Sequence, residues 1–216
     1  TASPVPVPTA TPTTADGFCS DRETMDTSSG HFSFGESYAG DACLMKSDDL
    51  EFSGVYGTVG AAYDDVELSA TVLSAGSIKR DYGLYLRVPE WSPGDVRWNV
   101  DAGYRCTVFT GPSNTKPCKL RLQSLTNSRP TTVSASSTFF LTEDHWYTVE
   151  AYAIGASLGC AIRKADGTLL ASTEGTDDTY ASGHVGTWNA MDDFGSHYWK
   201  SFAVLPGADA ESDVIT

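Results

Sequence analysis

The sequence predicts an all-β protein, an antiparallel β-sandwich of the jelly-roll kind. Apolar and polar residues alternate with a period of two along most of the chain, as they do in strands with one buried face. Glycine, proline, asparagine and aspartate punctuate these stretches at short intervals, which is typical of turns. No long segment has a helical period. Roughly ten short strands with regular turns favour a sandwich or jelly roll.

The clearest strands lie in the first half of the chain. In residues 65–73, "DVELSATVL", apolar residues alternate with polar ones, which predicts one buried and one outer face. Residues 82–88, "YGLYLRV", repeat the pattern, with Leu84 and Leu86 on the buried side. The other expected strands share this alternation and their flanking turns: 95–103, 104–111, 118–125, 145–154, 158–172, 183–190 and 198–205.

The composition divides the chain into three parts. Residues 1–16 are rich in proline and threonine, which predicts an extended, polyproline-like arm or linker. Residues 17–206 form the expected β-sandwich domain, and residues 207–216 form an acidic C-terminal tail. With 216 residues and 40% hydrophobic content, the chain is long enough for about one domain with a real core.

The net charge and the first residue of the chain indicate which partners and which location to expect. The chain has 14 Lys and Arg against 28 Asp and Glu, a formal net charge of −14. Phosphates would be repelled, so neither nucleic acid nor an anionic bilayer is an expected partner. No apolar run reaches the length of about 20 residues that spans a membrane. A start at Thr1 rather than methionine suggests a removed signal peptide, and hence secretion to the cell surface or beyond.

The five cysteines predict disulfides rather than a metal site. Proximity in sequence favours the pairs Cys19 with Cys43 and Cys106 with Cys118. Cys160 is then left over, as a buried free thiol or, alternatively, as half of an intermolecular bridge. No CxxC motif occurs, so zinc has no support and no metal is expected from the cysteines.

The order of several segments resembles the concanavalin A-like, laminin-G-like jelly rolls of secreted bacterial multidomain proteins. The resemblance covers roughly residues 24–206 and rests on "DTSSGHF", "DDVELSATV", "YGLYLRV", "WYTVEAYAIGASLGCAIRKADGTLLAS", "YASGHVGTWNA" and "YWKSFAVLP". It implies the fold and an extracellular setting, with carbohydrate-binding modules, adhesive domains, hydrolases and lyases among the relatives. His31 replaces the usual tryptophan, and Lys200 replaces the usual acid, which weakens the expectation of calcium.

Strand alternation also predicts a glycan-binding face. If Leu84, Leu86, Trp98, Val100, Val185 and Thr187 line the core, a polar and aromatic set faces outward. An outer aromatic ring can cover the apolar face of a sugar, while arginine and asparagine bond its hydroxyls or an acidic group. The alternative is that the arginines pair with Glu67 or Asp101 and that the tryptophan packs under a loop. The candidate residues are Tyr85, Arg87, Arg97, Asn99 and Trp188.

No catalytic constellation is recognisable, so a non-catalytic module is expected. The chain lacks the closely spaced Glu-x-Asp-x-Glu acids of glycosidases on this fold. The acid pairs at 48–49, 64–65, 177–178 and 192–193 read as turn residues; a calcium ion in one such loop is the alternative. A polysaccharide lyase using His184, or His197 with Tyr198, is a further alternative.

Self-assembly is the remaining alternative. A cell-surface filament or layer would form if the N-terminal arm of one subunit added a strand to the sheet of the next. Prolines at 4, 6, 8 and 12 leave only one side of the arm able to pair.

Overall fold

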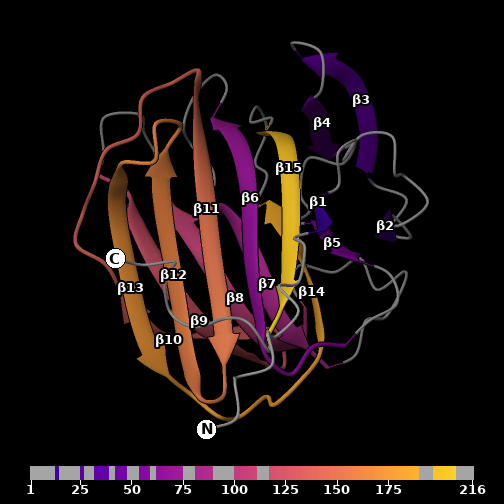
Figure 1. Ribbon diagram of the computed structural model, residues 1–216, viewed down its shortest axis with the longest axis vertical. Coiled ribbons are helices and arrows are strands. Elements are labelled where there is room, and N and C mark those ends of the chain that lie inside the picture. Colours follow the sequence, from indigo (N-terminus) through magenta and orange to yellow (C-terminus); the bar gives the residue numbers. More distant parts are fainter. Residues whose placement is uncertain are drawn as a thin grey trace, which may run out of the picture.

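The computed structural model describes residues 13–14, 25–26, 32–38, 42–47, 54–58, 62–74, 81–89, 100–110, 117–189 and 197–207. All regular structure in these residues is β, in two sheets whose paired strands are antiparallel (Figure 1). The predicted fold class is therefore confirmed. Within the described part of the chain, no helix is long and apolar enough to cross a membrane.

One sheet has eight strands and forms the front layer in Figure 1. In spatial order its strands are β13 (Leu169–Thr176), β12 (Ser157–Lys164), β11 (His145–Ile154), β6 (Val66–Ser74), β15 (His197–Pro206), β4 (Ala42–Ser47) and β3 (Phe32–Tyr38), with β1 (Thr13–Thr14) paired to β15. The pairing of β1 joins the last part of the predicted arm to the domain of the same chain.

The second sheet has seven strands and lies behind the first in Figure 1. In spatial order its strands are β10 (Arg129–Ala135), β9 (Lys119–Thr126), β8 (Ala102–Phe109), β7 (Tyr82–Val88), β14 (His184–Asn189), β5 (Gly54–Thr58) and β2 (Met25–Asp26). Strands β7 to β10 form a meander, because each pairs with its neighbour in sequence.

The main core fills the space between the two sheets. In β11 every second side chain is buried, as the alternation predicted. Leu84 and Leu86 of β7 and Val185 of β14 lie in this core, as expected from the sequence.

A disulfide joins the two sheets through the core. It links Cys106 of β8 to Cys160 of β12, with the Cα atoms 5.6 Å apart. The predicted pairing of Cys106 with Cys118 is wrong, and so is the prediction that Cys160 is free. Cys118 is a buried free thiol instead.

The sheet register explains this error. Phe109 pairs with Lys119, so Cys118 lies opposite residue 110, four residues along β8 from Cys106. At about 3.3 Å per residue this is roughly 13 Å, too far for a disulfide. Cys19 lies outside the described residues, and the side chain of Cys43 does too, so that predicted pair stays a prediction.

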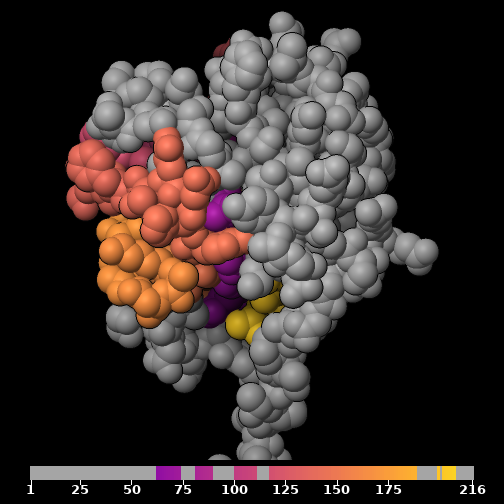
Figure 2. Space-filling model, turned by 90° about the horizontal axis from the view of Figure 1, so that it is seen from above, coloured from indigo at the N-terminus to yellow at the C-terminus, as the bar shows by residue number. Residues whose placement is uncertain are grey.

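Two segments lie side by side at the upper end of the molecule. They are the connection between β10 and β11 and the turn between β12 and β13, seen in Figure 2 in coral and orange. Phe140 is an exposed side chain of the first segment, and Lys164 is exposed at the start of the second. Lys164 belongs to β12 of the eight-stranded sheet and serves below as a control position. Phe140 follows Phe139, whose backbone pairs with Cys118 next to Lys119, so Phe140 lies near the outer face of the seven-stranded sheet.

Candidate functional site

The outer face of the seven-stranded sheet carries a transverse row of polar and aromatic side chains. Tyr85 of β7 pairs with Arg105 of β8, and Arg105 pairs with Gln123 of β9. Gly186 and Thr132 continue the row on either side. Directly paired residues of antiparallel strands point to the same face. This face is opposite the main core, because the alternate residues of β7, β8 and β9 fill that core.

A second row runs beside the first and contains Trp188. Trp188 of β14 pairs with Gly83, which pairs with Thr107, and Thr107 pairs with Arg121. Because Gly83 has no side chain, the indole can lie across β7. The guanidinium carbon of Arg105 is 4.3 Å from the centroid of the Trp188 ring. That distance is within the range of a cation–π interaction.

A buried hydrogen-bond network holds Arg105 in this position. The Gln123 Oε1 atom accepts hydrogen bonds from Arg105 Nε at 3.1 Å and Arg105 Nη2 at 2.9 Å. It also accepts a hydrogen bond from Thr107 Oγ1 at 3.0 Å. All three residues are buried, so these bonds form in a low-dielectric setting. The guanidinium plane is therefore preorganised on the tryptophan ring.

Tyr85 and Trp188 lie on the predicted face, but the exposure expected of them is wrong. Their exposed fractions are 0% and 3%, and with Val88, Val100 and Leu125 they form a second apolar cluster. Val100, expected in the main core, belongs to this outer cluster. Burial raises the pKa of the Tyr85 phenol, although the nearby Arg105 guanidinium acts to lower it. The two rings form the base of the face rather than its accessible surface.

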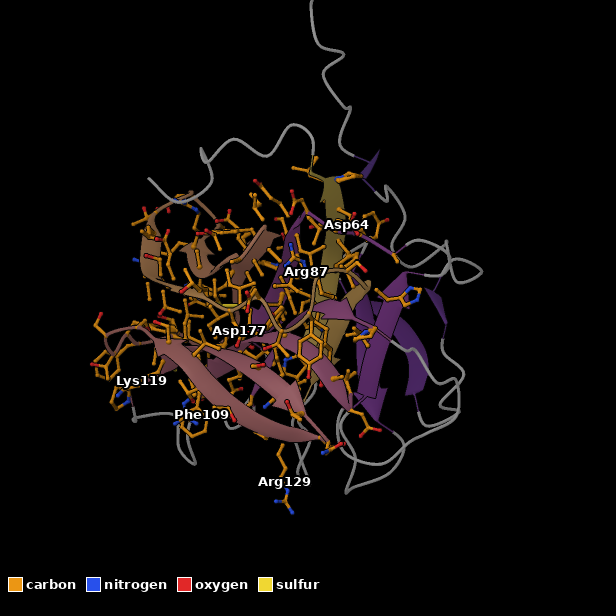
Figure 3. The ribbon with its side chains drawn as sticks, turned by 90° about the horizontal axis from the view of Figure 1, so that it is seen from below. Asp64, Arg87, Phe109, Lys119, Arg129 and Asp177 are labelled. Carbon is orange, nitrogen blue, oxygen red and sulfur yellow. A yellow bond between two sulfur atoms is a disulfide. The ribbon has the colours of Figure 1, made fainter. Side chains whose placement is uncertain are left out.

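Arg87 is not on this face, and its predicted outward orientation is wrong. The φ of Arg87 is 49°, a left-handed value that interrupts the strand geometry. Its side chain therefore does not follow the in-and-out alternation of its neighbours. The guanidinium, 2% exposed, donates hydrogen bonds to the carbonyl oxygens of Asp64 (2.6 Å), Gly155 (2.7 Å) and Tyr180 (3.1 Å), and to Asp65 Oδ1 (3.1 Å). Figure 3 shows Arg87 between the two layers, toward Asp64. Arg87 is thus a structural cross-link rather than a ligand contact.

The accessible part of this face lies where β8 ends and β9 begins. Lys119 is exposed, and Phe109 and Arg121 are half-buried. The guanidinium carbon of Arg121 is 3.6 Å from the centroid of the Phe109 ring. Figure 3 shows Phe109 and Lys119 close together on the outer side of the sheet. The sequence reasoning missed these three residues, although the alternation of "YRCTVFTG" and "CKLRLQSL" places them opposite the core-facing residues.

The remaining predicted contacts, Arg97 and Asn99, lie outside the described residues. They stay predictions.

The acid pairs considered for calcium serve as structural acceptors where they are described. Asp65 Oδ1 accepts hydrogen bonds from Arg87 and from the Gly155 backbone N–H at 2.7 Å. Asp177 Oδ1 accepts from the Tyr104 hydroxyl at 2.9 Å and from the Thr179 N–H at 2.8 Å. Within the described ranges, no group of three His, Cys, Asp or Glu residues could hold a metal ion. The pairs at 48–49 and 192–193 lie outside those ranges.

The outer face of the eight-stranded sheet has a different chemistry. Glu67 is buried there, and this burial, with a contribution from Glu150, raises the pKa of the Glu67 carboxyl. Glu150 Oε2 accepts a hydrogen bond from Arg163 Nε at 2.9 Å. The two histidines considered for a lyase lie in different sheets, His184 in β14 and His197 in β15.

Comparisons with known proteins place the chain among lectin-like β-sandwiches by fold. No family model and no curated protein matches its sequence. The carbohydrate-binding module CBM66 from Bacillus subtilis is similar in structure, with a TM-score of 0.56 and 13% identity over 82% of this chain and 92% of that one. The exoplasmic/lumenal domain of VIP36, bound to Ca²⁺ and Man3GlcNAc, has a TM-score of 0.64 and 14% identity, covering 88% and 86%.

A third similar structure is a legume lectin-like domain from Entamoeba histolytica. Its TM-score is 0.62 at 10% identity, covering 85% of this chain and 90% of that one. The resemblance to concanavalin A-like jelly rolls is thereby confirmed at the level of the fold. At these identities the likeness concerns the fold alone.

Proposed function

We propose that this chain is an extracellular, non-catalytic module that binds glycan on the outer face of its seven-stranded sheet. The observation that carries the proposal is the accessible pair of Phe109 and Arg121 on that face, with the guanidinium carbon 3.6 Å from the ring centroid. Similar structures include a carbohydrate-binding module and a domain bound to Man3GlcNAc, which supports the same ligand class. The inter-sheet disulfide is compatible with an oxidising compartment outside the cytosol.

Phe109 and Arg121 are the proposed direct contacts. An aromatic ring or a guanidinium plane can cover the apolar face of a pyranose, and guanidinium N–H groups can donate to its hydroxyl oxygens. Tyr85 and Trp188 would support these contacts from below, since both are buried. Arg97 and Asn99 are proposed as additional contacts from the segment that precedes Val100.

A glycan array with two variants that each truncate an apolar side chain tests the proposal. We expect Phe109→Ala to weaken selective binding about tenfold, because it removes an aromatic contact. Leu169→Ala truncates an exposed apolar side chain of β13 in the eight-stranded sheet and should bind as the wild type does. Equal binding by all three proteins would contradict the proposed face. The absence of binding to any glycan would contradict the function itself.

Two further variants test the remaining expectations. Trp188→Ala should weaken binding only together with a loss of folding stability, because the ring is buried beneath the face. Light scattering of the protein, with and without residues 1–16, tests self-association through the arm. A monomeric full-length protein would rule out the filament alternative.

A further inference from the structure

Cations are concentrated in the seven-stranded sheet, although the protein as a whole is strongly acidic. Strands β5, β7, β8, β9, β10 and β14 contain no aspartate or glutamate, and the edge strand β2 contains one, Asp26. The same strands contain five arginines and lysines: Arg87, Arg105, Lys119, Arg121 and Arg129. In a chain with a formal net charge of −14, this is a pronounced local reversal of sign.

The outer face of the eight-stranded sheet carries an excess of negative charge. Register pairs place Glu67, Glu150 and Glu174 on its outer face, around Tyr152 and Gly159. Arg163 lies on the same face and pairs with Glu150, so glutamates remain in excess there. Of the five cations above, Arg87 lies between the sheets, and Arg129 begins β10 at the far end of the hairpin from Lys119. Arg105, Lys119 and Arg121 remain on the outer face of the seven-stranded sheet. A groove or face of one sign attracts ligands of the other.

Lys119 and Arg121 are the accessible members of this set. They are two residues apart on β9 and point to the same face, which separates their Cα atoms by about 7 Å. Neither makes an ion pair or a side-chain hydrogen bond with any described residue, and the Arg121 guanidinium lies on the Phe109 ring. Stacking on a ring leaves the N–H edge of a guanidinium free for a bidentate bond to an anionic group.

We propose that the glycan bound on this face is anionic, and that Lys119 and Arg121 bind its carboxylate or sulfate groups. This inference rests on the proposed function and names the ligand class of the same site. Arg121, oriented by Phe109, would pair with a planar carboxylate through two N–H donors, while Lys119 would supply a second charge along the strand. Arg105, buried beneath, would add to the positive potential without touching the ligand.

Matched pairs of charged and neutral polymers test the inference. The probes are oligogalacturonate against its fully methyl-esterified form, and dextran sulfate against dextran, measured by calorimetry with the full chain. We expect binding to one charged member of these pairs and much weaker binding to its neutral partner. Raising the salt from about 0.05 M to about 0.5 M should reduce the affinity for the charged probe, because the contacts are largely exposed.

Variants then locate the contact. Arg121→Ala should lower the affinity for the charged probe about tenfold or more, as expected for loss of a charge-assisted hydrogen-bond pair. Arg121→Lys keeps the charge but loses the planar fork, so it should restore only part of the affinity for a carboxylate. Lys119→Ala should weaken binding as well. Lys164→Ala, an exposed lysine outside this face, should not.

Each opposite result has a distinct meaning. Equal weakening by Lys164→Ala and Lys119→Ala would show unspecific attraction and overturn the inference. Binding of a neutral glycan that Phe109→Ala abolishes, with no preference for charged polymers, would overturn the anionic ligand but leave the proposed function intact. The absence of any glycan binding would overturn both. Circular dichroism of each variant confirms that it is folded.

Discussion

The indole of Trp188 lies across the backbone of Gly83, its direct partner in the antiparallel pair of β14 and β7. A Cβ atom at Gly83 would overlap the carbonyl oxygen of Cys106 and come within 2.9 Å of Trp188 Nε1. Tyr152 and Gly159 form an equivalent pair on the outer face of the opposite sheet, where a Cβ atom at the glycine would overlap the tyrosine ring. On each sheet, a large aromatic ring thus covers a strand position that only glycine can occupy.

The Gly83→Ala substitution should destabilise the domain by about 2 kcal/mol or more, because the overlap involves backbone that cannot move away. Urea unfolding followed by tryptophan fluorescence measures this loss. Gly155→Ala is the control, since no atom lies within 4 Å of the position that a Cβ atom would take there and only its φ of 54° opposes the change, at a cost of about 1 kcal/mol. Equal losses for the two variants would contradict the close approach of the Cys106 carbonyl oxygen to Gly83.

Arg87→Met should destabilise the protein by about 3 kcal/mol, because three carbonyl oxygens and the Asp65 carboxylate lose their donor. Thermal or urea unfolding is the measurement. Arg129→Met, at an exposed site, should change the stability by no more than about 0.5 kcal/mol. If Arg87→Met unfolded like the wild type but lost glycan binding, Arg87 would be a ligand contact and its structural role would be secondary.

Reducing the disulfide between Cys106 and Cys160 should cost about 4 kcal/mol, the chain-entropy value for a sequence separation of 54 residues. Digestion without reduction should yield one peptide pair joined through these two cysteines. Cys118→Ala should leave that pair intact. Recovery of a Cys106 to Cys118 peptide would contradict the register described above.

The free thiol offers an independent check on the same region. Burial raises the pKa of Cys118 to about 11, so the thiol should stay protonated and resist alkylation in the folded protein near pH 8. Unfolding in urea should expose it to the reagent at once. Rapid labelling of Cys118 without denaturant would show that this side chain is accessible.

Glu67→Gln should stabilise the protein at pH 7. Burial and Glu150 raise the carboxyl pKa in the folded state above its ordinary value of 4.5, so the wild type loses stability as the pH rises through that folded value and Glu67 ionises. Well below pH 4.5 the carboxyl is neutral in both the folded and unfolded states, and the two proteins should unfold alike. Urea midpoints across this pH range measure the difference. A constant difference at all pH values would show that the effect is not ionisation.

Local alternation was sufficient to predict much of this architecture. It identified strands β6 to β9 and β11 to β15, the inward positions of Leu84, Leu86 and Val185, and the outer face for Tyr85 and Trp188. It missed β2 to β5 and β10. These properties depend on a period of two, which each strand carries in its own residues. The same alternation also contained Phe109 and Arg121, but nothing local distinguished them from other polar or aromatic positions.

Three features of the structure depended on residues far apart in the chain. The disulfide partner of Cys106 is determined by which strands face each other across the core, and Cys160 lies 54 residues away. The direction of Arg87 is determined by a left-handed φ and by carbonyl oxygens up to 93 residues distant. Tyr85 and Trp188 are buried because they pack with Val88, Val100 and Leu125 in an apolar cluster on this face. Strand alternation is a property of neighbouring residues, whereas pairing, burial and charge clustering exist only once the sheets have assembled, because they depend on distance in space.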